Sequence, residues 1–113
     1  MRNRPDDNQH DIVSALRRSG AVVVPMDRNA GFDILVGYNG RLYPIEIKDG
    51  NKPLSARALT ENEQFRQTQF QSVGVQYHVV SSVDEALGVL EFGKSNQRLT
   101  SDVTTDSINV TIA

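Results

Sequence analysis

The chain has 113 residues, of which 38% are hydrophobic and 23% charged, with no cysteine and a formal net charge of −2. These values fit one globular domain, and they exclude disulfides, thiolate zinc sites, a cysteine nucleophile and, because no apolar run approaches ~20 residues, a membrane-spanning helix. The N-terminus is basic but leads into polar residues rather than an apolar signal core, so we expect a cytoplasmic protein without a membrane partner.

The first segment predicts a helix followed by a strand. Residues 8–19 place apolar side chains at helical spacing, with Asn8 as a candidate cap and Gly20 as the end. The apolar stripe of this helix is Ile12, Val13 and Leu16. Residues 21–26 form a short β-branched run that predicts a strand, and the polar residues 27–31 predict a turn.

The next segment contains a strong hairpin signal. Asn39 and Gly40 stand between two strand-like runs, and this dipeptide is typical of a two-residue hairpin turn. We therefore predict that residues 32–38 and 41–48 pair as antiparallel strands.

The following segment predicts a second helix. Residues 51–59 are a predicted loop, after which residues 60–63 fit a capping box that opens the helix, and Gly74 closes it. Its expected apolar contacts are Phe65, Phe70 and Val73. Residues 75–80 form another apolar strand run, and residues 82–85 fit a second capping box that opens a short helix through Leu90.

The resulting order, α-β-β-β-α-β-α, predicts an α/β domain with a mixed β-sheet flanked by helices. The strand–helix–strand unit of residues 41–80 should be a right-handed crossover that joins parallel strands. We assign this domain to residues 1–92. Residues 93–113 form a polar tail in which residues 108–112 alternate in hydrophobicity, so a late strand and a disordered tail both stay open.

The hairpin places a pair of carboxylates together. If Asn39 and Gly40 are the turn, Asp33 falls opposite Glu46 at a non-hydrogen-bonded pair, where β-carbons lie roughly 4.5–5.5 Å apart. Lys48 lies two residues beyond Glu46 and therefore projects from the same face.

Two facing carboxylates repel each other, and a divalent cation between them removes that penalty. Mg²⁺ suits such a site because it takes oxygen ligands and is often held by one or two carboxylates and a substrate phosphate. Lys48 could then hold the attacking water or stabilise charge on the phosphate. Structural alternatives are a capping role for Asp33 and a solvent-facing salt bridge between Glu46 and Lys48.

These residues resemble a known signature. Gly31-Phe-Asp33-Ile-Leu-Val, followed thirteen residues after the aspartate by Glu46-Ile-Lys48, is similar to the motif of PD-(D/E)XK nucleases. The Glu-Ile-Lys-Asp-Gly run, with Leu59-Thr60 and Gln64 after it, resembles the small stand-alone VRR-NUC domains of phages and bacteria. The resemblance covers roughly residues 7–90, and Phe32 stands where the family has a proline that is not a ligand.

This resemblance implies a restriction-endonuclease-like fold and hydrolysis of DNA phosphodiester bonds with Mg²⁺ or Mn²⁺. It implies that Asp33, Glu46 and the backbone carbonyl of Ile47 hold the metal, and that Lys48 assists the nucleophilic water. The family often adds a residue from the first helix. Gln9 lies in line with the apolar stripe and Asp11 on the opposite side, so we favour Gln9 over Asp11.

Several further residues are candidates for DNA contacts. Gln64 resembles another family position near the site, and Lys52 and Arg57 follow the second hairpin strand in a loop. The other arginines that could contact phosphates are Arg2, Arg4, Arg17 and Arg18, of which the last two could equally be a solvated helix end. The slightly acidic total charge does not exclude DNA, because binding needs only a local basic patch.

Family analogy suggests branched or Holliday-junction DNA as the substrate and a homodimer as the assembly, because a symmetric junction needs two cuts. Two alternatives stay open: a catalytically inactive DNA-binding or assembly module with the same fold, and a nuclease that acts on flaps or ends. Metal-dependent cleavage and a substrate panel would separate them.

Overall fold

The computed structural model describes residues 6–91 and confirms the predicted element order α-β-β-β-α-β-α. The regular elements are α1 (Asp6–Arg18), β1 (Val22–Pro25), β2 (Ile34–Tyr38), β3 (Arg41–Ile47), α2 (Glu61–Ser72) and β4 (His78–Val80), and residues 83–91 form the last helix. Short 3₁₀ turns precede β2 and α2, at Arg28–Ala30 and Leu54–Arg57. The expected tail of residues 93–113 lies outside the described residues, as do Arg2 and Arg4. No helix within residues 6–91 has the length and apolar character to cross a membrane.

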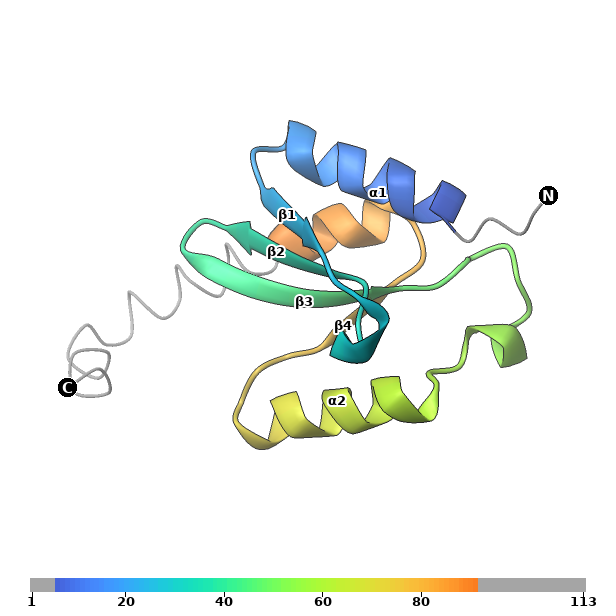
Figure 1. The fold of residues 1–113 in the computed structure, drawn as a ribbon. Helices are drawn as coiled ribbons and strands as arrows, with labels where there is room; N and C mark the ends of the chain where they lie inside the picture. The colour runs from blue at the N-terminus through green and yellow to red at the C-terminus, as the bar shows by residue number, and fades with distance from the viewer. Residues whose placement is uncertain (1–5, 92–113) are drawn as a thin grey trace, which may run out of the picture.

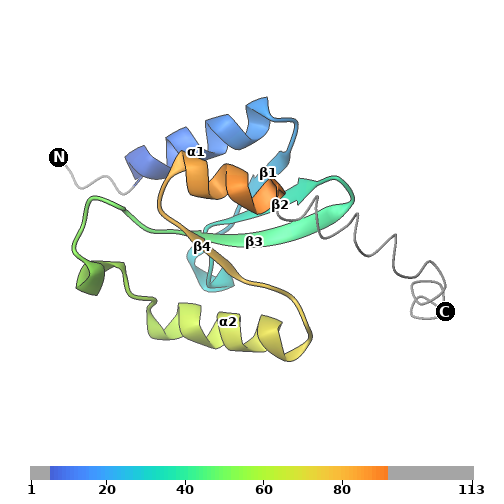
Figure 2. The same cartoon turned by 180° about the vertical axis from the view of Figure 1, so that it is seen from behind.

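The elements form three layers (Figures 1 and 2). The α1 helix and the helix of residues 83–91 lie on one face of the sheet, and α2 lies on the other. The sheet has the order β1-β2-β3-β4. β1 and β3 pair antiparallel with β2, and β4 pairs parallel with β3, as predicted for the crossover.

The core lies between the sheet and the layer formed by α1 and the helix of residues 83–91. Its fully buried members include Ile12 and Leu16 from the predicted stripe of α1, and Ile34, Val36 and Ile45 from the central strands. Ala86, Val89 and Leu90 of the last helix complete the cluster. The two central strands are thus fixed by apolar packing on one face, which leaves their other face available for polar residues.

The hairpin forms at the predicted turn and in the predicted register over most of its length. Asn39 and Gly40 both have positive φ angles, 54° and 83°, which the two central residues of a type I′ turn require. The strands are shorter than predicted, at Ile34–Tyr38 and Arg41–Ile47, and the β2–β3 ladder ends at the pair Ile34↔Ile45.

Asp33 therefore does not continue the ladder as a direct partner of Glu46, and that detail of the prediction is wrong. The Asp33 N–H donates to the Ile45 carbonyl at 3.1 Å, and the Asp33 carbonyl accepts from the Met26 N–H at 2.9 Å. The chain bends here because a 3₁₀ turn immediately precedes, ending at Gly31 with a φ of 81°. This bend brings the side chain, rather than the backbone, of Asp33 towards the end of β3.

Two predictions about the helices are also wrong. Asn8 is not the cap of the first helix, because α1 begins at Asp6 and Asn8 lies inside it. The second helix buries none of its residues, and Phe65 and Val73 are 59% and 73% exposed. Only Phe70 packs as expected, with its ring 5.8 Å from that of Phe32. The α2 helix is therefore positioned more by polar contacts than by an apolar face.

The capping boxes differ in completeness. At α2 both bonds are present: Thr60 Oγ1 accepts from the Glu63 N–H at 3.2 Å, and Glu63 Oε1 accepts from the Thr60 N–H at 2.9 Å. Before the last helix, Ser82 Oγ accepts from the Glu85 N–H, but the Glu85 carboxylate accepts from Ser81 instead of Ser82. The preceding strand, β4, covers only the second half of the predicted run 75–80.

Candidate active site

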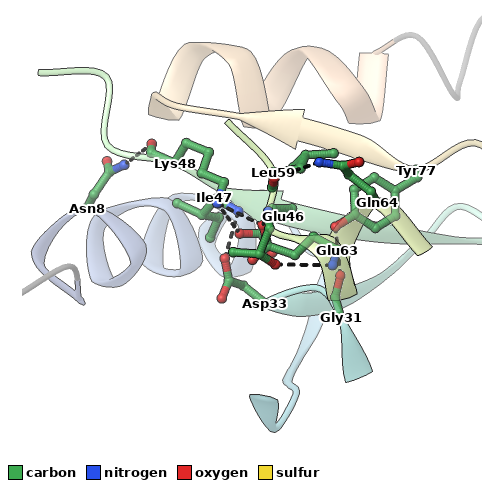
Figure 3. A network of polar contacts seen from close by, with 11 residues as sticks. Asn8, Gly31, Asp33, Glu46, Ile47, Lys48, Leu59, Glu63, Gln64 and Tyr77 are labelled. Atoms are coloured by element: carbon green, nitrogen blue, oxygen red, sulfur yellow. Dashed lines mark hydrogen bonds and ion pairs between the residues drawn. The ribbon is translucent and has the colours of Figure 1, made fainter. Parts of the chain in front are cut away.

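Asp33 stands just before β2 and uses its side chain to complete the end of the sheet. Its Oδ2 atom accepts from the Ile47 N–H at 2.8 Å, in place of a backbone acceptor on β2 (Figure 3). Burial raises the pKa of Asp33, and the hydrogen bond from Ile47 opposes that rise. One carboxylate oxygen is thus tied to β3, and the other is left for a ligand.

Glu46 is the only charged residue of the described chain that is buried, at 3% exposure. Burial, the negative charge of Asp33 and the nearby carboxyl group of Glu63 raise its pKa to about 9. Asp33 and Glu46 line the same cleft, and the charge of Asp33 acts on the Glu46 carboxyl group. The predicted juxtaposition of these two acids therefore arises, although Asp33 is not a ladder partner of Glu46.

Lys48 extends from the end of β3 and lies between two acids. Its Nζ atom is 3.3 Å from Glu46 Oε2 and donates to Glu63 Oε1 at 2.9 Å. Burial alone would lower the pKa of Lys48, but the hydrogen bond to Glu63 and the charge of Glu46 outweigh burial and raise it. The lysine is thus held as a cation beside the carboxyl pair.

The sequence predicted only a helix-capping role for Glu63, but the structure also places it in this cluster. Its Oε1 atom accepts from both the Thr60 N–H and the Lys48 ammonium, so the same carboxylate fixes the start of α2 and orients the lysine. Burial opposes ionisation of Glu63, but the hydrogen bonds from Lys48 and Thr60 prevail and lower its pKa. The capping box identifies Glu63 in the sequence, but it does not predict the contact of Glu63 with Lys48 at the end of β3.

We expect Thr60→Ala to lower the free energy of unfolding by about 1 kcal/mol, because it removes the side-chain half of the capping box. It should also slow any reaction that depends on Lys48, since Glu63 loses part of its alignment. Thermal unfolding and an activity assay on the same preparation measure both effects. Thr68→Ala, an exposed substitution in the middle of α2, is the control, and equal behaviour of the two variants would contradict this role.

The first helix contacts the end of β3 through Asn8. Asn8 Nδ2 donates to the Lys48 carbonyl at 2.8 Å, which ties α1 to the end of β3. Gln9 is half-buried and Asp11 is exposed, in agreement with the predicted helix faces. A functional role for Gln9 stays a prediction.

The residues predicted to contact DNA lie around the second 3₁₀ turn and the start of α2. Gln64 is exposed and donates to the Leu59 carbonyl at 3.0 Å, Lys52 is exposed, and Arg57 is half-buried. None of the three lines the cleft that holds Asp33 and Glu46. Their contacts with DNA stay predictions.

This cleft has a volume of about 530 Å³ and opens between the start of α2 and the loop before β2. Its lining includes Asp33 and Glu46, Thr60 and Glu63 from the start of α2, and Arg28 from the loop. Buried Glu46 and half-buried Asp33 are therefore both accessible from the cleft.

The donor set fits a hard divalent cation such as Mg²⁺. Asp33 and Glu46 offer carboxylate oxygens, and the raised pKa of both groups shows that a nearby positive charge would be favourable. The Ile47 N–H points to Asp33, and in a strand the carbonyl of the same residue faces the same side. Within residues 6–91 no group of three or more acidic, histidine or cysteine side chains converges as a complete metal cage. Mg²⁺ does not require one, because it usually keeps several waters.

The layered arrangement and the strand order define the architecture as a restriction-endonuclease-like fold. The chain is similar to a solved structure described as a VRR_NUC domain, with a TM-score of 0.57 and 21% sequence identity over 80% of this chain and 97% of the other. No family model matches the sequence, and no curated protein matches it. The comparison of folds thus supports the resemblance drawn from the sequence motif.

Proposed function

We propose that this chain is a metal-dependent endonuclease that hydrolyses DNA phosphodiester bonds. The observation that carries the proposal is the arrangement of the Lys48 ammonium 3.3 Å from buried Glu46, whose carboxyl group adjoins Asp33 at the floor of an open cleft. A buried acid with a strongly raised pKa is costly for folding, and such groups concentrate at functional sites. The similarity in fold to a VRR_NUC domain supports the same interpretation.

In this proposal each residue has a distinct task. Asp33, Glu46 and the Ile47 carbonyl would hold Mg²⁺ or Mn²⁺, which supplies Lewis-acid stabilisation of a phosphoryl oxygen when bound. Lys48 orients the water that attacks phosphorus and stabilises negative charge that develops on the phosphate. Glu63 keeps the lysine charged and holds it beside Glu46. Asp33 stays oriented because Ile47 holds one of its oxygens.

We further propose branched DNA, such as a Holliday junction, as the substrate and a homodimer as the active form. One small domain provides one such cleft, whereas resolution of a symmetric junction needs two cuts, and a two-fold dimer supplies them. This step rests on the symmetry of the substrate.

The proposal is tested with a panel of labelled four-way junction, flap, linear duplex and single-stranded DNA, each with Mg²⁺, Mn²⁺ or EDTA. We expect cleavage that requires a metal and is fastest on the junction. Fastest cleavage of flaps or ends would replace the junction assignment. Binding without cleavage in either metal would make the chain a DNA-binding module. Sedimentation analysis of the same protein, alone and with the junction, tests the dimer.

A further inference from the structure

The loop before β2 is tied down along its whole length. Four of its backbone carbonyls accept hydrogen bonds from side chains of α2 and of Tyr77, next to β4. The four bonds run from Asn62 Nδ2 to the Arg28 carbonyl (3.3 Å), from Arg66 Nη2 to the Asn29 carbonyl (3.3 Å), from Arg66 Nε to the Ala30 carbonyl (2.7 Å), and from Tyr77 Oη to the Gly31 carbonyl (2.7 Å). A surface loop held at four successive carbonyls presents its side chains from a rigid support.

Gly31 allows this close approach. A β-carbon at this position would lie 2.8 Å from Arg66 Cβ and 3.2 Å from the Asn62 carbonyl oxygen, so no side chain fits there. The loop and α2 therefore meet directly and form two walls of the cleft above Asp33 and Glu46.

Acidic residues outnumber cationic residues in the lining of the cleft. Its acidic lining residues are Asp27, Asp33, Glu46 and Glu63, whereas Arg28 is the one cationic residue in its lining. Asp27 caps the 3₁₀ turn through the Asn29 N–H at 2.9 Å. Arg28 is exposed, and among residues 6–91 its guanidinium forms no ion pair. A rigid loop thus presents an uncommitted cation at the mouth of an acidic cleft.

We propose that Arg28 binds a backbone phosphate of the DNA strand that enters the cleft, next to the bond that is cut. This inference rests on the proposed function and adds a substrate-binding residue to it. A phosphodiester is repelled by the acidic lining, and a guanidinium on the cleft wall offsets that repulsion by paired hydrogen bonds to phosphate oxygens. The proposal also gives the DNA strand a path, along the cleft that the loop of residues 27–31 and the start of α2 line.

The test compares Arg28→Gln and Arg28→Lys with Arg41→Gln, an arginine beside the hairpin turn, at the other end of β3 from Glu46. Affinity for a fluorescein-labelled four-way junction is measured by anisotropy with Ca²⁺ at several salt concentrations, and kcat and KM are measured with Mg²⁺. We expect Arg28→Gln to weaken binding about 5- to 30-fold and to reduce the slope of log affinity against log salt by roughly 1, as for one lost phosphate contact. Arg28→Lys should retain most of the salt slope.

The outcomes separate this inference from the proposed function. If the wild type cuts DNA and Arg28→Gln matches Arg41→Gln in affinity, salt slope and KM, the Arg28 assignment is wrong and the nuclease proposal stands. If the wild type binds DNA but does not cut it in any metal, the nuclease proposal fails and the assignment of Arg28 beside a scissile bond fails with it. Circular dichroism and thermal unfolding show that each variant is folded, so that a loss of binding is a loss of contact.

Discussion

Glu46→Gln is expected to reduce Mg²⁺-dependent DNA cleavage by at least ~10³-fold while leaving the fold intact, because it removes a charged oxygen ligand from the proposed metal centre. The amide has nearly the shape of the carboxyl group, so the apolar packing of β3 beneath it is retained. Asp33→Asn should have a similar effect, since it removes the other carboxylate while an amide oxygen can still accept from the Ile47 N–H. Single-turnover cleavage of a labelled junction measures both losses.

The matched control is Glu61→Gln, the same change at an exposed position in the first turn of α2. It should cut DNA at nearly the wild-type rate and lose only a few tenths of a kcal/mol of helix stability. Full activity in folded Glu46→Gln would contradict the assignment of the site. Loss of activity in all three variants would show that the general acidity of this surface, and not the carboxylate pair, is what matters.

Glu46→Gln should also stabilise the metal-free protein relative to the wild type, and by more as the pH rises. The pKa of Glu46 is raised from 4.5 to about 9, so the folded state holds a proton that the unfolded chain releases above pH 4.5. The free energy of unfolding of the wild type therefore falls between about pH 4.5 and pH 9. At full effect, a tenfold difference in proton affinity between the folded and unfolded states corresponds to about 1.4 kcal/mol. The raised pKa of Asp33 acts in the same direction, and the lowered pKa of Glu63 opposes it.

In EDTA, Glu46→Gln should match the wild type near pH 5 and exceed it by about 1–3 kcal/mol near pH 8, a rise in Tm of several degrees. Thermal unfolding across this range measures the difference. Addition of Mg²⁺ should then stabilise the wild type more than Glu46→Gln, because only the wild type keeps both carboxylates. A constant difference between the two proteins at all pH values would show that the Glu46 carboxyl group does not titrate abnormally.

Local signals in the sequence were sufficient to predict the β2–β3 hairpin and the α1 helix. The Asn39–Gly40 turn set the register of β2 and β3, because both residues adopt the positive φ angles that this turn demands. The apolar spacing of α1 identified Ile12 and Leu16, which are fully buried. Register and periodicity are properties of neighbouring residues, so they can be predicted without knowledge of the whole fold.

Contacts between distant segments could not be predicted in the same way. Lys48 and Glu63 lie 15 residues apart and meet only because the connection after β3 returns α2 to the end of the strand. Asn8 and Lys48 lie 40 residues apart and meet through the packing of α1 on the sheet. The exposure of Phe65 is likewise a tertiary result, because the sheet beneath the start of α2 carries the polar cluster rather than an apolar surface.

Glu63 illustrates how one side chain can serve stability and chemistry together. In its capping role it accepts from the Thr60 N–H, and in the site it accepts from Lys48 with the same oxygen atom. Formation of the first turn of α2 is therefore coupled to the position of the lysine. The placement of this helix start over the cleft explains why α2 is fixed by polar contacts at this end.

The most direct test of the proposed active centre is single-turnover cleavage of a labelled four-way junction by the wild type and by Lys48→Ala, with Mg²⁺ and with EDTA. We predict that the wild type cuts only with the metal, and that Lys48→Ala cuts at least ~10²-fold more slowly, because the charge beside Glu46 is lost. Equal cleavage by the two proteins, or cleavage by the wild type in EDTA, would contradict a metal-dependent nuclease centred on Asp33, Glu46 and Lys48.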